Sequence, residues 1–185
     1  MKADDVVKVD VTDEMINKAW DDQQFFEANI GAKSRPAVKQ SRGDFTGSMG
    51  HQAVESLLTL WQVPFEGLRK DRKEYGQGDY ADLIYDEDVI DVKTHFGQYD
   101  PKYFYNHQFL VFQKQIDNPK FKLLTHLLFV LVSGKDWDIP DTARIFGVIS
   151  VDDFLKKSTE VKLIYDNRAI TPRNITPLRD YIFRI

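Results

Sequence analysis

The sequence predicts one mixed α/β domain, and three observations lead to that fold class. The chain has 185 residues, the size of a single domain with a sizeable core. Hydrophobic residues make up 42% of the chain and aromatic residues 13%, which excludes a disordered protein. Segments with helical spacing of apolar residues alternate with short segments typical of strands. We therefore expect a single domain over residues 1–185.

Two helices are predicted in the first third of the chain. The first covers residues 11–30 and has Thr12 as its N-cap. The second covers residues 47–61, where Leu57 lies on an apolar stripe and Glu55 lies at the edge of that stripe. Between them, residues 31–47 are rich in Gly, Ser, Lys and Arg, which predicts a long basic loop.

The remaining elements are predicted to be mostly strands. Dense apolar or alternating segments predict them, and turn residues separate them. Ser150 followed by Asp153 has the spacing of a capping box, which predicts a short helix. The predicted strands cover 62–68, 80–84, 89–93, 123–132, 143–149 and an edge strand at 161–165, and the predicted helices cover 103–115 and 151–157.

Composition excludes several classes of protein. No apolar run reaches the ~20 residues that a membrane span needs, so we expect no membrane association. Acidic residues stand where a secretory signal would carry its apolar region, and the chain has no cysteine, so we expect a cytosolic location. The net charge of -4 argues against a histone-like protein that binds nucleic acid through its overall positive charge.

The segment 80–93 predicts a hairpin with carboxylates on one face. Strand alternation places Asp82 on one face of the first strand, and it places Asp91 and Lys93 on one face of the second. With a two-residue turn at Asp86 and Glu87, Asp82 lies opposite Asp91, and their Cβ atoms are about 5 Å apart. Two like charges at that distance repel, and a divalent cation removes the repulsion. Carboxylates converging from adjacent strands suit Mg²⁺, which also takes waters and substrate phosphate oxygens as ligands.

Other catalytic motifs are missing from the sequence. It contains no GxxxxGK[ST], no GxGxxG and no GxSxG, and its histidines have no HExxH spacing. His95 follows Lys93 closely, and we interpret it as a loop or supporting residue of the same site.

Asp82 is followed nine residues later by Asp91 and then by Lys93, and a predicted helix upstream carries Glu55. This arrangement resembles the PD-(D/E)xK nuclease superfamily. The resemblance covers residues 47–150 and implies a restriction-endonuclease-like fold, a mixed central sheet flanked by helices with an α-β-β-β-α-β core. Ala81 stands where the proline that names the superfamily would be.

The resemblance also implies a mechanism. Asp82, Asp91, the backbone carbonyl of Val92 and Glu55 would hold one or two Mg²⁺ ions, which Mn²⁺ would replace, and these ions activate water against a phosphodiester. Lys93 would orient the water or help to deprotonate it. Gln113, with Gln108 as the alternative, would be the polar residue of the helix that follows.

DNA is the expected partner. Two basic clusters lie near the predicted site and predict phosphate contacts that weaken as salt rises. We expect a homodimer, because one active site cuts one strand at a time, and the compact size fits a nuclease encoded by a phage or mobile element. Two alternatives stay open: a catalytically silent module that binds nucleic acid or protein, and a metal-dependent phosphohydrolase of small nucleotides. The clusters comprise Lys33, Arg35, Lys39, Arg42, Arg69, Lys70, Arg72 and Lys73.

Overall fold

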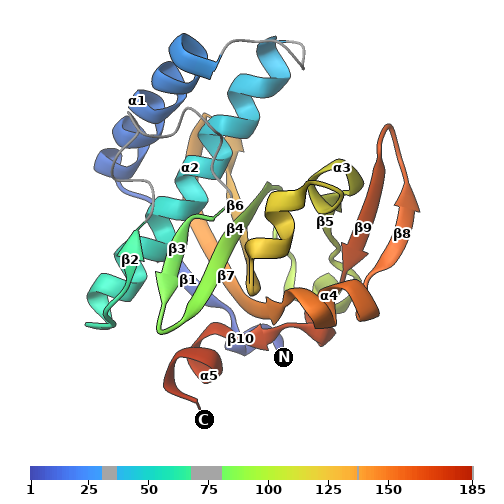
Figure 1. The fold of residues 1–185 in the computed structure, drawn as a ribbon. Helices are drawn as coiled ribbons and strands as arrows, with labels where there is room; N and C mark the ends of the chain where they lie inside the picture. Colours follow the sequence, from blue (N-terminus) through green and yellow to red (C-terminus); the bar gives the residue numbers. More distant parts are fainter. Residues whose placement is uncertain (31–36, 68–80, 137, 185) are drawn as a thin grey trace.

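The fold is a curled mixed sheet with two long helices on one face and a smaller second sheet with short helices on the other (Figure 1). The computed structural model describes residues 1–30, 37–67, 81–136 and 138–184. Among these ranges, no helix is long and apolar enough to cross a membrane. The helices are α1 (Asp13–Ile30), α2 (Ala37–Leu60), α3 (Gln113–Ile116), α4 (Val151–Lys157) and α5 (Leu178–Phe183).

The main sheet has the strand order β1-β7-β6-β4-β3-β2, and β10 also pairs with β7. Only the β4–β6 pair is parallel among the described strand pairs, so the sheet is mixed. Its strands are β1 (Val7–Asp10), β2 (Glu66–Gly67), β3 (Leu83–Tyr85), β4 (Asp88–Phe96), β6 (His126–Asp136), β7 (Ile139–Ser150) and β10 (Thr176–Pro177). The second sheet, ordered β5-β9-β8, contains β5 (Phe109–Phe112), β8 (Thr159–Lys162) and β9 (Asp166–Ile170).

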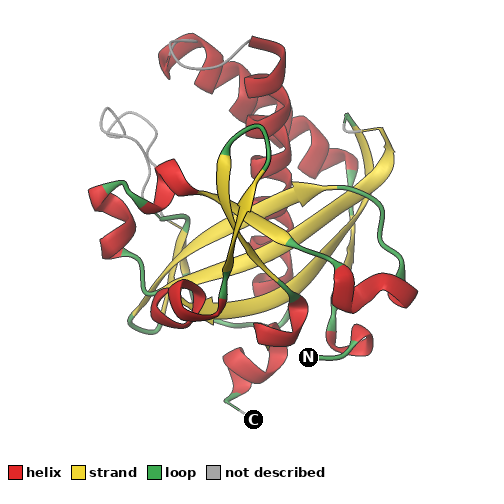
Figure 2. Cartoon of the chain, turned by 90° about the vertical axis from the view of Figure 1, so that its right-hand side faces the viewer, coloured by secondary structure: helices red, strands yellow, loops and turns green. Residues whose placement is uncertain are grey.

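Each face of the main sheet has its own hydrophobic core. On one face, Leu83, Ile90 and Val92 pack with buried residues of α2. On the other face, Phe129 of β6 packs with Phe109 of the second sheet. Figure 2 shows the second sheet lying across the front of the curled main sheet, with the long helix behind. The alternation of β4 therefore points its even-numbered residues toward α2 and its odd-numbered residues toward the second sheet.

α2 is longer than the sequence predicts. Residues 37–47, predicted as part of a loop, belong to this helix. Phe45 is fully buried, and its ring centroid lies 4.7 Å from that of Trp20 on α1. Packing against α1 outweighs the low helix propensity of Gly43 and Gly47, a tertiary effect that composition does not reveal.

The predicted helix at 103–115 is also wrong. This segment forms a 3₁₀ helix (Pro101–Asn106), then β5, then the short α3. In β5, Phe109 and Val111 are fully buried and Phe112 is exposed, which is the period of a strand. The partner of β5 is β9, more than fifty residues later in the chain, so the pairing is invisible locally.

Smaller differences affect the predicted strands. The strand predicted at 62–68 is limited to β2 within the described residues, because α2 extends to Leu60 and a turn follows. The edge strand predicted at 161–165 is shifted, since β8 ends at Lys162. The helix α4 has the predicted bounds, and the Ser150 hydroxyl accepts a hydrogen bond from the Asp153 N–H at 3.2 Å.

Close packing of α2 on β4 gives a paired test of the fold. A Cβ at Gly50 would lie 1.9 Å from Oγ1 of Thr94, whereas a Cβ at Gly47 would meet nothing within 4 Å. Gly50→Ala should destabilise the protein, because overpacking costs about 1–3 kcal/mol while the gain in helix propensity is only about 1 kcal/mol. Gly47→Ala should keep that gain. Urea unfolding measures both variants, and equal stability would contradict the close contact between helix and strand.

Candidate active site

The β3–β4 hairpin has the predicted register. Leu83 pairs with Ile90 and Tyr85 pairs with Asp88, which leaves Asp86 and Glu87 as a two-residue turn. Asp86 adopts a φ of 57°, the left-handed conformation that such tight turns use. Asp82 lies one residue before β3, and its N–H donates to the carbonyl of Ile90 at 2.9 Å. The regular pairing ends at Leu83 and Ile90, and Asp82 lies beside Asp91 closely enough for its charge to act on the Asp91 carboxyl.

The carboxylate of Asp82 is buried against the backbone of β4. Its side chain is 8% exposed, and Oδ2 accepts a hydrogen bond from the Val92 N–H at 2.7 Å. The N–H and C=O of one residue point to the same edge of a strand. The carbonyl of Val92 therefore points toward the edge at which Asp82 lies, as the proposed ligand set requires.

Asp91 and Lys93 form an ion pair on the face of β4 that looks toward the second sheet. Nζ of Lys93 lies 2.6 Å from Oδ2 of Asp91, and the side chains are 14% and 18% exposed, respectively. Burial raises the pKa of Asp91 to about 6. Lys93 opposes this increase, and Asp82 adds to it through its charge and a side-chain hydrogen bond. The two aspartates are therefore close enough for each to disfavour the charge of the other.

The glutamine beside the ion pair is Gln115. Its Oε1 lies 3.5 Å from Nζ of Lys93, and both Gln115 and Gln113 belong to α3. The side-chain amide of Gln113 donates instead to Oδ1 of Asp117 at 2.8 Å. Gln108 is exposed and lies before β5. A short α3 reverses the expected choice, because only a residue two positions beyond Gln113 reaches Lys93.

Glu55 approaches the site from α2, and a histidine lies between it and Asp82. Nε2 of His51 lies 3.1 Å from Oε1 of Glu55, and its Nδ1 lies 3.6 Å from Oδ1 of Asp82. The side chain of His51 is 2% exposed. Gly67 leaves room for this arrangement, because a Cβ there would lie 2.6 Å from Oε1 of Glu55.

His51 is not among the site residues predicted from the sequence, although the sequence contains one indication of it. Its signal was the separation of four residues between His51 and Glu55, which places both side chains on one face of a helix. Lys18 of α1 adds a positive charge to this side, with Nζ 3.7 Å from Oε2 of Glu55. The cluster thus collects groups from α1, α2, β4 and the residue before β3.

His95 supports the structure rather than the acidic cluster. It lies within β4, not in the predicted loop, and its Nε2 lies 3.1 Å from the carbonyl oxygen of Leu110. Burial lowers the pKa of His95 to about 4, so the imidazole is neutral at physiological pH. His95 therefore links β4 to β5.

Most of the predicted DNA-binding residues lie outside the described part of the chain. Arg42 is exposed on α2. Lys39 also belongs to α2, but its side chain is not described. The residues outside the described ranges are Lys33, Arg35, Arg69, Lys70, Arg72 and Lys73.

The acidic pair fits Mg²⁺ through the chemistry of its donors. Among the described residues, no group of three or more His, Asp and Glu side chains forms a ready metal site. Mg²⁺ does not need one, since it is commonly bound through one or two carboxylates and keeps several waters. Asp82 raises the pKa of Asp91 through its charge, and a cation bound between the two carboxylates would remove this repulsion.

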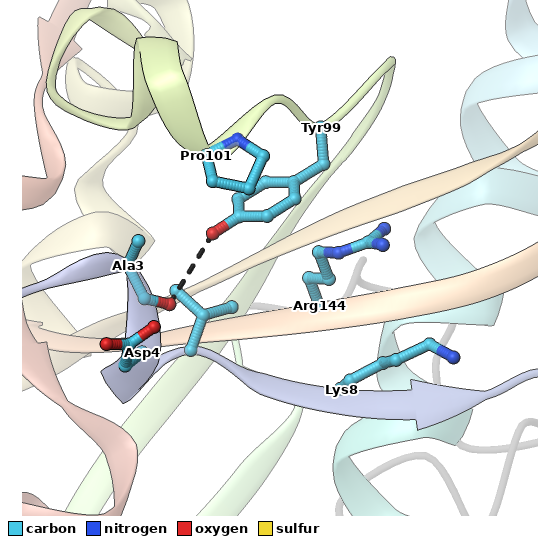
Figure 3. A pocket seen from close by; sticks show the side chains of 7 residues that line it. Ala3, Asp4, Lys8, Tyr99, Pro101 and Arg144 are labelled. Carbon is cyan, nitrogen blue, oxygen red and sulfur yellow. Dashed lines mark hydrogen bonds between the residues drawn. The ribbon is translucent and has the colours of Figure 1, made fainter.

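A separate cavity of about 280 Å³ is lined by none of these residues. Figure 3 shows Tyr99 above the N-terminal segment, with Arg144 and Lys8 beside it. The Tyr99 hydroxyl donates to the carbonyl of Ala3 at 3.5 Å, and the Arg144 guanidinium lies 4.6 Å from the centroid of the Tyr99 ring. This cavity is formed by the N-terminal segment, β7 and the loop after β4, away from the acidic pair.

Comparisons with protein-family models, curated protein sequences and solved structures find no match to the chain.

The raised pKa of Asp91 has a consequence for stability without metal. Because the pKa of this carboxyl is higher in the folded protein than the ordinary 3.8, its protonation stabilises the folded state. This stabilisation is lost as the pH rises from about 4 to about 6. Asp91→Asn removes this loss. In EDTA, its stability relative to wild type should increase by on the order of 2 kcal/mol between pH 4 and pH 7. Urea unfolding at both pH values measures the difference.

Glu87→Gln is the matched control, because Glu87 is an exposed acid in the turn of the same hairpin. Its relative stability should change by less than about 0.5 kcal/mol over the same range. A flat profile for Asp91→Asn would show that Asp91 titrates like an ordinary exposed aspartate.

Proposed function

We propose that this protein is a Mg²⁺-dependent DNA nuclease, most simply an endonuclease, of the PD-(D/E)xK type. The observation that carries the proposal is the β3–β4 hairpin, at whose end Asp82 lies beside Asp91, with Lys93 two residues after Asp91 on β4. A buried pair of carboxylates next to a lysine is expensive for a structural element, whereas a metal-dependent phosphodiesterase needs this set of groups.

The order of elements supports a restriction-endonuclease-like fold. α2 is followed by β2, β3 and β4, then by α3 and β6, which gives helix, three strands, helix and strand. β2, β3 and β4 pair in sequence as antiparallel neighbours, and β6 adds to β4 in parallel. β5 is an addition to this order, inserted before α3 as part of the second sheet.

The residues divide the chemistry among themselves. Asp82, Asp91 and the Val92 carbonyl would hold Mg²⁺, which supplies a water of lowered pKa and neutralises charge on the phosphate. Lys93 would lie beside the attacking water, held by Asp91 on one side and Gln115 on the other. Glu55 would act from the α2 side, where His51 and Lys18 fix the direction of its carboxylate.

DNA binding and assembly complete the proposal. The basic residues of 33–42 and 69–73 would contact phosphates, since in the sequence they lie at or before the start of α2, which carries Glu55, and before Asp82. A homodimer would place two sites on the two strands of a duplex. Binding that is insensitive to salt would contradict the assignment of these residues.

Cleavage of closed circular and linear DNA tests the catalytic claim. Wild type should cleave with Mg²⁺ or Mn²⁺ and should not cleave with EDTA. Asp91→Ala and Lys93→Ala should each lower the rate by about a hundredfold or more, because they remove a metal ligand and the group beside the water. Glu87→Ala and Lys135→Ala change exposed residues of the same charges and should cleave like wild type.

Persistent cleavage by Asp91→Ala would contradict the mechanism. Turnover of small nucleotides without DNA cleavage would favour the phosphohydrolase alternative, and metal-independent DNA binding without turnover would favour the silent module. Cutting of closed circular DNA identifies an endonuclease.

Metal binding has a readout that does not depend on activity. At a Mg²⁺ concentration tenfold above Kd, wild type should gain about 1.4 kcal/mol, which raises Tm by roughly 3–5 °C. Asp82→Asn should abolish this increase because it removes one of two carboxylates, whereas Glu87→Gln should retain it. The same Mg²⁺-dependent shift in Asp82→Asn would place the cation elsewhere.

A further inference from the structure

The loop between β8 and β9 is made entirely of exposed apolar residues. Lys162 pairs with Asp166, which leaves Leu163, Ile164 and Tyr165 as a three-residue hairpin loop. These side chains are 63%, 82% and 57% exposed, respectively. Hairpin loops normally use Gly, Asn, Asp or Ser, and three consecutive exposed apolar residues are unfavourable unless they serve a function.

Phe112 extends this surface. It is 38% exposed at the end of β5 and lies edge to face with Tyr165, with ring centroids 5.8 Å apart and planes at 87°. We call Phe112, Leu163, Ile164 and Tyr165 the apolar tip. It presents two aromatic rings and two branched aliphatic side chains to solvent. Contiguous exposed apolar groups of this kind mark binding surfaces.

The apolar tip is connected to the candidate active site through α3. Phe112 directly precedes α3, and Gln115 of α3 contacts Lys93. Figure 1 shows α3 between β4 and the β8–β9 hairpin. A ligand that extends from the acidic pair across α3 therefore reaches the tip.

The segment that follows Phe112 in the chain and begins with α3 carries a net positive charge. Residues 113–124 contain three lysines, Lys114, Lys120 and Lys122, and one acid, Asp117. Lys114 and Lys122 are exposed. Positive charge beside exposed aromatic rings is the combination that binds single-stranded nucleic acid, where phosphates contact lysines and bases stack on rings.

We infer that the apolar tip binds unstacked bases of single-stranded or locally opened DNA whose backbone enters the candidate active site. This inference rests on the proposed function, because DNA is the substrate proposed there. Leu163 and Ile164 would act as a wedge against a base step, and Tyr165 and Phe112 would stack on the freed base. Intact duplex hides its base faces, so it would engage the tip less.

A single cysteine reports on the tip directly, because the chain contains no cysteine. Ile164→Cys carries an environment-sensitive fluorophore. Leu60→Cys is the matched control, since Leu60 is 76% exposed at the end of α2. In EDTA at low salt, a 20-nucleotide single strand should change the emission of the Ile164→Cys conjugate with saturation, and the duplex of the same sequence should need at least fivefold more DNA. The Leu60→Cys conjugate should not respond.

A second variant removes the contacts instead of reporting them. The triple change Leu163→Ser, Ile164→Ser and Tyr165→Ala should weaken binding of the single strand by about tenfold or more, because each stacked base contributes substantially to affinity. Its affinity for duplex should change less than twofold. Leu60→Ser should bind both DNAs like wild type.

Three outcomes would overturn the inference: no emission change with the single strand, equal responses to single strand and duplex, or a change that depends only on protein concentration, which indicates self-association. Cleavage in Mg²⁺ is measured separately. If wild type cleaves DNA but the Ile164→Cys conjugate does not respond to the single strand, this inference alone is wrong. A tip that responds to single strand in a protein without cleavage defeats the catalytic proposal alone.

Discussion

The structure of the candidate site depends on one backbone constraint, the register of the β3–β4 hairpin. A two-residue turn at Asp86 and Glu87 fixes which residues of the hairpin face each other. Asp82, the residue before β3, is held against β4 because its N–H donates to the Ile90 carbonyl and its carboxylate accepts from the Val92 N–H. A shift of one residue would move Asp91 and Lys93 to the α2 face and break the cluster. β4 is also held by β6 and covered by α2 and the second sheet, so the carboxylates have little freedom to separate.

Burial of these carboxylates lowers the stability of the folded protein, and we expect the site to use them for its chemistry. Burial, and after it the charge of Asp82, raises the pKa of Asp91 to about 6, which reflects the cost of this placement. Lys93 offsets part of it, and a cation would offset more. His51 is buried between the carboxylates of Glu55 and Asp82, although neither ring nitrogen makes a well-directed hydrogen bond. Burial of carboxylates and a histidine beside an otherwise apolar core is typical of a site in which stability is given up for chemistry.

The hairpin and its acidic pair could be predicted from sequence because alternation and a tight turn are local signals. The predictions failed where tertiary packing decides. Burial of Phe45 turns a glycine-rich basic segment into helix, and pairing with β9 turns an aromatic segment into β5. Gln115 replaces Gln113 beside Lys93 for the same reason, because the bounds of α3 follow from where β5 ends. His51 was missed because its four-residue spacing from Glu55 indicates a site only once the strand that the helix faces is known.

The most direct measurement is a crystal structure of the wild-type protein with Mn²⁺, using anomalous scattering to locate the metal. We predict an anomalous peak between the carboxylates of Asp82 and Asp91. The metal should have the Val92 carbonyl among its ligands, and Lys93 should be separated from Asp91 by no more than a water. An unchanged ion pair between Lys93 and Asp91 in the presence of Mn²⁺, with no peak between the carboxylates, would contradict this prediction.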